Sequence, residues 1–86
     1  MLQVFTTHYG SRGTVVKLAA SHSDAAVAKY VIERRGAVVL VKTATHDRGR
    51  PCMASRVFPG SMEQAVTSCE RECERILDRG VADAAA

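Results

Sequence analysis

Cys69 and Cys73 form the pair of residues whose spacing could most readily do chemistry. They lie one helical turn apart, so their thiolates could share a metal ion. Val66 and Ile76 lie on the same side of the expected helix, so this side is apolar. In such an environment cysteine usually packs as a small hydrophobic residue. The chain contains no C-x-x-C or H-x-x-x-H motif to supply further ligands. We therefore expect both cysteines to lie in the core, with no metal and no cofactor.

Three histidines could act as general bases. His8, His22 and His46 are expected at a strand end, a helix start and a turn, which keeps them apart. A nucleophile must lie within hydrogen-bond reach of its base, and no G-x-S-x-G turn presents a serine in this way. Glycine-rich phosphate-binding motifs are also missing from the sequence. We predict no catalytic residues and a protein that is not an enzyme.

Two turns carry similar sequences and exposed arginines. The stretch THYGSRG contains Arg12, and the stretch THDRGR contains Arg48 and Arg50. Arginine is favoured at interfaces because its planar head donates several hydrogen bonds. We interpret the two turns as hairpin tips that contact a partner and that lie at opposite ends of one sheet.

The charge of the chain is unevenly distributed. The formal net charge is +3, but residues 1–60 carry nine Lys/Arg against three Asp/Glu, whereas residues 61–86 carry three against six. A basic surface suits an acidic protein or a nucleic acid. On the second helix, Arg71–Glu74 and Arg75–Asp78 are predicted to form exposed ion pairs.

The N-terminal half reads as a hairpin followed by a helix. Alternating apolar and polar residues predict strands at 2–8 and 14–20, joined by a glycine-bearing turn. Ser21 and Asp24 resemble a helix start. Because Val27, Ala28 and Val31 recur at helical spacing, a helix is predicted over 21–35.

The C-terminal half repeats this order. Strands are predicted at 37–44 and 52–58. Ser61 and Gln64 have the spacing of a capping box at the start of a second helix, which is predicted to end at Gly80. Residues 1–80 form a single compact domain in this interpretation, and 81–86 form a short flexible tail.

The predicted fold is therefore α+β with the order ββαββα. It has a four-stranded mixed sheet and two helices packed on one face, with a right-handed crossover between parallel strands. The predicted core consists of Leu2, Val4, Val16, Leu18, Val27, Val31, Val39, Val41, Val66, Cys69, Cys73 and Ile76.

The opposite face of the sheet is predicted to be a contact surface, because no further layer of chain covers it. It should carry Phe5, Val15, Lys17, Leu40, Lys42, Arg56 and Phe58. The candidate binding residues are Arg12, Lys17, Lys42, Arg48, Arg50 and Arg56. An open face of this kind would also allow homodimerisation.

These features predict a small non-enzymatic protein that occupies a surface of a protein or ribonucleoprotein partner. Small inhibitors encoded by phages and mobile elements, including anti-CRISPR proteins, are similar in kind, and we expect an inhibitor of that type. The alternative is a nucleic-acid-binding protein that uses the basic sheet face and hairpin tips. No apolar run approaches the ~20 residues of a membrane span. With an odd number of cysteines and no signal peptide, a cytoplasmic location without membrane contact is expected.

Overall fold

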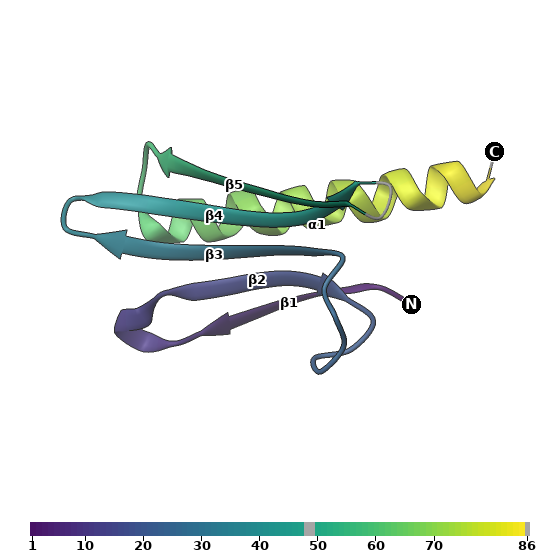
Figure 1. Ribbon diagram of the computed structural model, residues 1–86, viewed down its shortest axis with the longest axis horizontal. Helices are drawn as coiled ribbons and strands as arrows, with labels where there is room; N and C mark the ends of the chain where they lie inside the picture. The colour runs from purple at the N-terminus through teal and green to yellow at the C-terminus, as the bar shows by residue number, and fades with distance from the viewer. Residues whose placement is uncertain (48–49, 86) are drawn as a thin grey trace.

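The protein consists of an antiparallel sheet and one long helix (Figure 1). A computed structural model describes residues 1–47 and 50–85. The elements are β1 (Gln3–His8), η1 (Gly10–Arg12), β2 (Thr14–Ala19), β3 (Ala28–Arg35), β4 (Val38–Asp47), β5 (Arg50–Phe58) and α1 (Met62–Ala85). Each strand pairs with the next in the chain, in the order β1-β2-β3-β4-β5. The α+β class is confirmed.

The helix predicted over 21–35 is wrong, because this part of the chain contains β3. Ala28, Tyr30 and Ile32 are buried and alternate with residues on the other side of the strand. Val31 lies on that other side and is only half-buried. Tyrosine, valine and isoleucine all favour a pleated sheet surface, and pairing with β2 and β4 on both sides favours the strand over the helix.

The polar stretch before β3 forms a turn where a helix start was predicted. The Asp24 N–H donates to the Ser21 carbonyl at 3.2 Å, and the Ser21 and Ser23 hydroxyls lie 3.4 Å apart. Serine and aspartate suit both turns and helix N-termini for the same reason: their side chains bond to nearby backbone groups. These polar residues therefore mark a turn and not the start of a helix.

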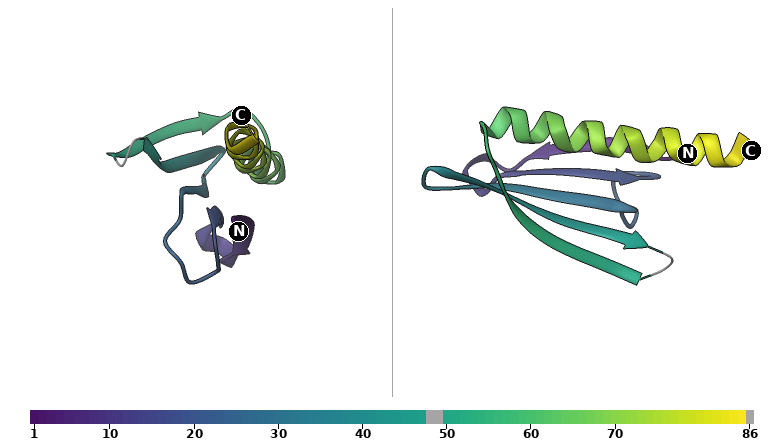
Figure 2. Two further views of the ribbon diagram at one scale, coloured as in Figure 1. Left: turned by 90° about the vertical axis from the view of Figure 1, so that its right-hand side faces the viewer. Right: turned by 90° about the horizontal axis from the view of Figure 1, so that it is seen from above.

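These changes remove the predicted crossover. The sheet has five strands and is wholly antiparallel, where four strands in a mixed sheet were predicted. α1 alone covers one face and packs mainly against β2 and β3. Figure 2 shows that β5 begins away from α1 and approaches it only towards its end. The last strand is therefore poorly covered by the helix.

The hairpin and helix boundaries agree better with the sequence. Gly10 and Gly13 both have positive φ, as the predicted turn between the first strands requires. The capping box is confirmed: Gln64 N–H donates to Ser61 Oγ at 3.1 Å, and Ser61 N–H donates to Gln64 Oε1 at 2.9 Å. The prediction that the second helix ends at Gly80 is wrong, because α1 continues to Ala85. Within the described residues, no helix is long and apolar enough to cross a membrane.

The core lies between α1 and the middle of the sheet. Val27 was predicted there but is 39% exposed, and Val31 lies on the outer face. Ala28, Tyr30 and Ile32 take their places, a direct result of β3 replacing a helix. The other predicted members are buried or packed against the core, namely Leu2, Val4, Val16, Leu18, Val39, Val41, Val66, Cys69, Cys73 and Ile76.

Candidate binding surfaces

The predicted binding residues do not form one site. Lys17 and Lys42 alternate along their strands with the buried Val16 and Val41, so they lie on the outer face of the sheet, away from α1, as predicted. Arg56 lies opposite Val41 in the β4–β5 register. Side chains opposite one another across a pair of strands share a face. Phe58 likewise lies opposite the buried Val39 and packs against the core. The predictions that Arg56 and Phe58 lie on the outer face are therefore wrong.

The arginines of the two turns are far apart. Arg12 is exposed in η1, between β1 and β2. Arg50 is exposed at the start of β5. Because successive strands are antiparallel, these two residues lie at opposite ends of the sheet (Figure 1), as predicted. Arg48 lies outside the described residues.

The side chain of Lys17 forms hydrogen bonds within the protein. Its ammonium group donates to the carbonyl oxygens of His22 and Asp24, the latter at 3.3 Å. The His22 ring also packs on Phe5, with ring centroids 5.2 Å apart. Lys17 and Phe5 therefore hold the connection between β2 and β3 over one end of the outer face.

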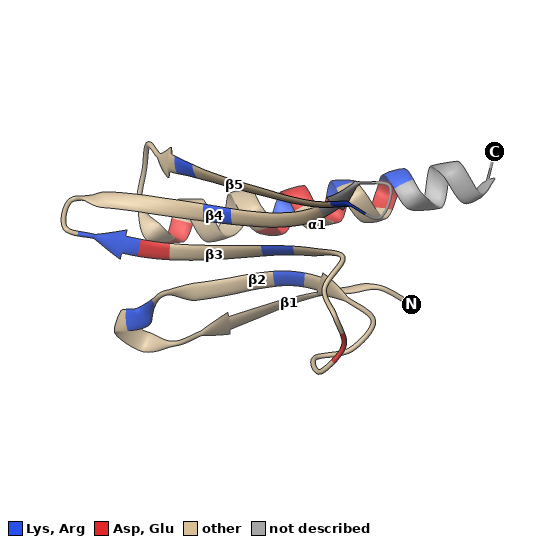
Figure 3. Cartoon of the chain, viewed as in Figure 1, with Lys and Arg blue, Asp and Glu red and all other residues tan. Residues whose placement is uncertain are grey.

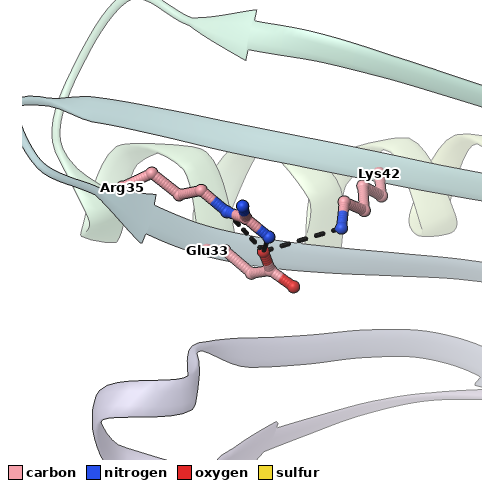
Figure 4. A network of polar contacts seen from close by, with 3 residues as sticks. All are labelled: Glu33, Arg35 and Lys42. Carbon is pink, nitrogen blue, oxygen red and sulfur yellow. Dashed lines mark hydrogen bonds and ion pairs between the residues drawn. The ribbon is translucent and has the colours of Figure 1, made fainter.

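Lys42 belongs to a small charged cluster on the outer face (Figure 4). Glu33 Oε2 lies 3.1 Å from Arg35 Nη2 and 3.7 Å from Lys42 Nζ. The cluster places one carboxylate between two cations, one from its own strand and one from β4. Part of the positive charge predicted for this face is thereby neutralised.

Arg56 links β5 to α1. Its Nη2 donates to Glu72 Oε1 at 3.0 Å. The hydrogen bond to Glu72 is the main reason that the pKa of Arg56 is raised above its ordinary value. Sequence spacing gives no signal for this pair, because the two residues lie on different elements and are 16 positions apart in the chain.

The outer face of β3, β4 and β5 carries an apolar area that the sequence only partly indicated. Met53 is 85% exposed and Val57 is 62% exposed. In the register, Met53 lies opposite Ala44, and Val57 lies opposite Leu40. A shallow groove of about 440 Å³ on this part of the sheet is lined by Lys29, Val31, Lys42, Thr43, Ala44, Met53, Ala54 and Ser55. The sequence signal for this area was the spacing of Met53, Ser55 and Val57, which occupy every second position of the strand and therefore share one face.

The cysteines of α1 are core residues, as predicted. Cys69 and Cys73 are fully buried, and burial raises the pKa of each thiol to about 11. A thiol with a raised pKa is a poor nucleophile near neutral pH, because the thiolate is the reactive form. Cys52 is exposed on β5. Among the described residues, no three His, Cys, Asp or Glu side chains gather as a metal site would require.

Charge on the exposed part of α1 is arranged differently from the prediction. The predicted pairs Arg71–Glu74 and Arg75–Asp78 are not formed within 4.0 Å; the ion pairs of the described residues are those of Glu33 and of Arg56 with Glu72. Figure 3 shows that the strands carry mainly Lys and Arg, whereas α1 carries both signs.

A second hollow lies between the end of β5 and α1. It has a volume of about 600 Å³ and is lined by Phe58, Pro59, Glu63, Gln64, Thr67, Ser68, Arg71 and Arg75. Polar side chains therefore dominate this hollow, in contrast to the apolar groove on the outer face.

The chain matches no known family profile, and no curated protein and no solved structure matches it.

Proposed function

We propose that this protein is a small non-enzymatic binding protein that occupies a surface of a protein or ribonucleoprotein partner. The observation that carries the proposal is the uncovered apolar area on the outer face of β3–β5. Met53 and Val57 are largely exposed there, beside the groove that Val31 and Ala44 line. Contiguous exposed apolar area rimmed by polar residues is typical of protein interaction sites. Lys29 and Lys42 supply the polar rim.

A protein surface fits this face better than a phosphate backbone does. Binding to nucleic acid depends on cations that are free to neutralise phosphates. Here Lys17 bonds to backbone carbonyls, and Lys42 lies beside Glu33. Arg56 lies on the other face and bonds to Glu72. The exposed apolar side chains of Met53 and Val57 favour a partner with apolar groups of its own.

A protein that acts by covering a surface can inhibit its partner, which is the role expected from the sequence. A second copy of the chain could occupy the same face and form a homodimer. The oligomeric state of the purified protein separates these roles, because a homodimer on this face would dissociate when Met53 is made charged.

Affinity purification from the native cells tests the proposal. The wild type is compared with Met53→Glu and with the control Ala25→Glu, which adds the same charge to an exposed position in the β2–β3 connection. A partner retained by Ala25→Glu and lost by Met53→Glu supports the proposal. A partner retained equally by both variants overturns it, as does nucleic acid that is retained at moderate salt without any protein.

A further inference from the structure

The sheet has two edges, and they differ in how the chain protects them. β1 is six residues long, and Thr6 on this strand donates to Glu70 of α1 at 2.6 Å. β5 is nine residues long and, among the described strands, pairs with β4 alone. Every residue of β5 before Phe58 is exposed. A long exposed edge strand presents unpaired N–H and C=O groups that can pair with another strand.

The position of Pro51 indicates which residues of β5 face this free edge. Proline has no N–H, so it is tolerated in an edge strand where its nitrogen points away from the neighbouring strand. Backbone groups alternate between the two sides of an antiparallel strand. Met53, Ser55 and Val57 are in phase with Pro51, so we expect their backbone groups to point outward.

Two arginines of α1 lie near the C-terminal end of β5. Arg71 and Arg75 line the hollow between α1 and the end of β5, beside Phe58. Among the described side chains, neither arginine has a carboxylate within 4.0 Å. Glu63 is the acidic residue of the same hollow. The balance of these charges is positive, which suits an acidic occupant.

We propose that the free edge of β5 accepts an extended acidic segment of another protein as a sixth strand. Its backbone would pair with the outward groups of Met53, Ser55 and Val57, and its carboxylates on the helix side would meet Arg71 and Arg75. Adding a strand to an exposed edge is a general mode of peptide recognition, in which backbone bonds give affinity and side-chain pockets give specificity. This edge adjoins the apolar outer face of β3–β5, but the contacts proposed here use backbone groups of β5 and arginines of α1 in place of the apolar side chains.

A second copy of the chain fits this edge less well. Antiparallel pairing of β5 with itself would bring Arg50 and Arg56 of both copies to one seam, together with the arginines of both helices. Like charges facing one another across strands are destabilising. The edge therefore favours an acidic partner over self-association.

Fluorescence anisotropy with labelled peptides tests the inference. The probes are an alternating Glu-Val peptide of about eight residues, a typical strand length, and its Lys-Val counterpart. The Glu-Val peptide should bind, and the Lys-Val peptide should not. The charge reversal Arg71→Glu/Arg75→Glu should weaken binding at least about ten-fold. The control charge reversal Ser11→Glu/Ala25→Glu/Arg34→Glu, with the same change in net charge at exposed positions away from β5, should leave the affinity unchanged.

Two further measurements distinguish strand addition from simple charge attraction. Ser55→Pro removes one outward N–H and should abolish peptide binding, with folding checked by circular dichroism. In the wild type, amide exchange at Met53, Ser55 and Val57 should slow when the peptide is bound. The inference is overturned by equal losses in both charge-reversal variants, by unchanged exchange on β5, or by a single-stranded RNA that displaces the peptide at lower concentration.

Discussion

Arg56 on β5 and Glu72 on α1 form an ion pair at 3.0 Å between Nη2 and Oε1. Because β5 is the strand that α1 covers least, this contact connects the edge strand to the layer that stabilises the rest of the sheet. Both side chains are partly exposed, at 47% and 27%. The pair therefore positions β5 more than it adds to global stability.

A double-mutant cycle measures this contact. Arg56→Ala, Glu72→Ala and the double variant should give a coupling energy of about 0.5 kcal/mol, since partly exposed pairs contribute little to stability. Hydrogen exchange along β5 should rise more in Arg56→Ala than exchange along β2. A coupling energy of zero, with β5 unchanged, would show that the pair does not hold the edge strand.

Gly13 is packed closely against β3, and its replacement should be costly. A Cβ at this position would lie 2.3 Å from the Ile32 carbonyl oxygen, and φ is +114°. Gly13→Ala should lower the free energy of unfolding by about 2 kcal/mol or more. Gly10→Ala is the matched control: its φ is also positive, but nothing lies within 4 Å of the added Cβ. Urea denaturation that gave equal losses for both variants would contradict this explanation.

The three cysteines should differ in their reaction with a thiol reagent. Cys52 is exposed, whereas Cys69 and Cys73 are fully buried. At about pH 8, close to the ordinary thiol pKa, one thiol per chain should react quickly and the other two only on unfolding. Cys52→Ser should abolish the fast phase. A remaining fast phase in that variant would place one of the helix cysteines at the surface.

The same cysteines should make the protein less stable as the pH rises into the alkaline range. Burial raises the pKa of Cys69 and Cys73 from 9.0 to about 11 in the folded protein. The unfolded state therefore loses these protons first, so the contribution of the two thiols to the free energy of unfolding should be constant below about pH 9 and fall between about pH 9 and 11. Cys69→Ala/Cys73→Ala should flatten this fall, and an identical slope in that variant would refute the assignment.

The elements that were predicted correctly have sequence patterns that fit only one type of local structure. The Ser61–Gln64 spacing satisfies the N–H groups at a helix start, and both predicted bonds are present. The alternation along β2 matches the side-chain period of a strand, so Val16 and Leu18 were correctly placed in the core. Cys69 and Cys73 followed the apolar stripe of the helix.

The incorrect predictions came from sequence patterns that are compatible with two different local structures. The stretch from Ser21 to Asp24 suits a helix cap and a turn equally well, and the apolar residues after it fit either period over so few positions. β3 wins because it pairs with strands on both sides. That pairing depends on residues distant in the chain, as does the Arg56–Glu72 contact. Neither can be read from local spacing.

Oxidative footprinting of the methionines tests most directly whether the outer face of β3–β5 is a contact surface. Met53 and Met1 are both highly exposed, at 85% and 102%, but Met1 lies at the N-terminus. Oxidation is compared in the free protein and in the complex with the partner isolated from native cells. Met53 should be oxidised much more slowly in the complex, with the rate at Met1 unchanged. An unchanged rate at Met53 would contradict the proposed binding surface.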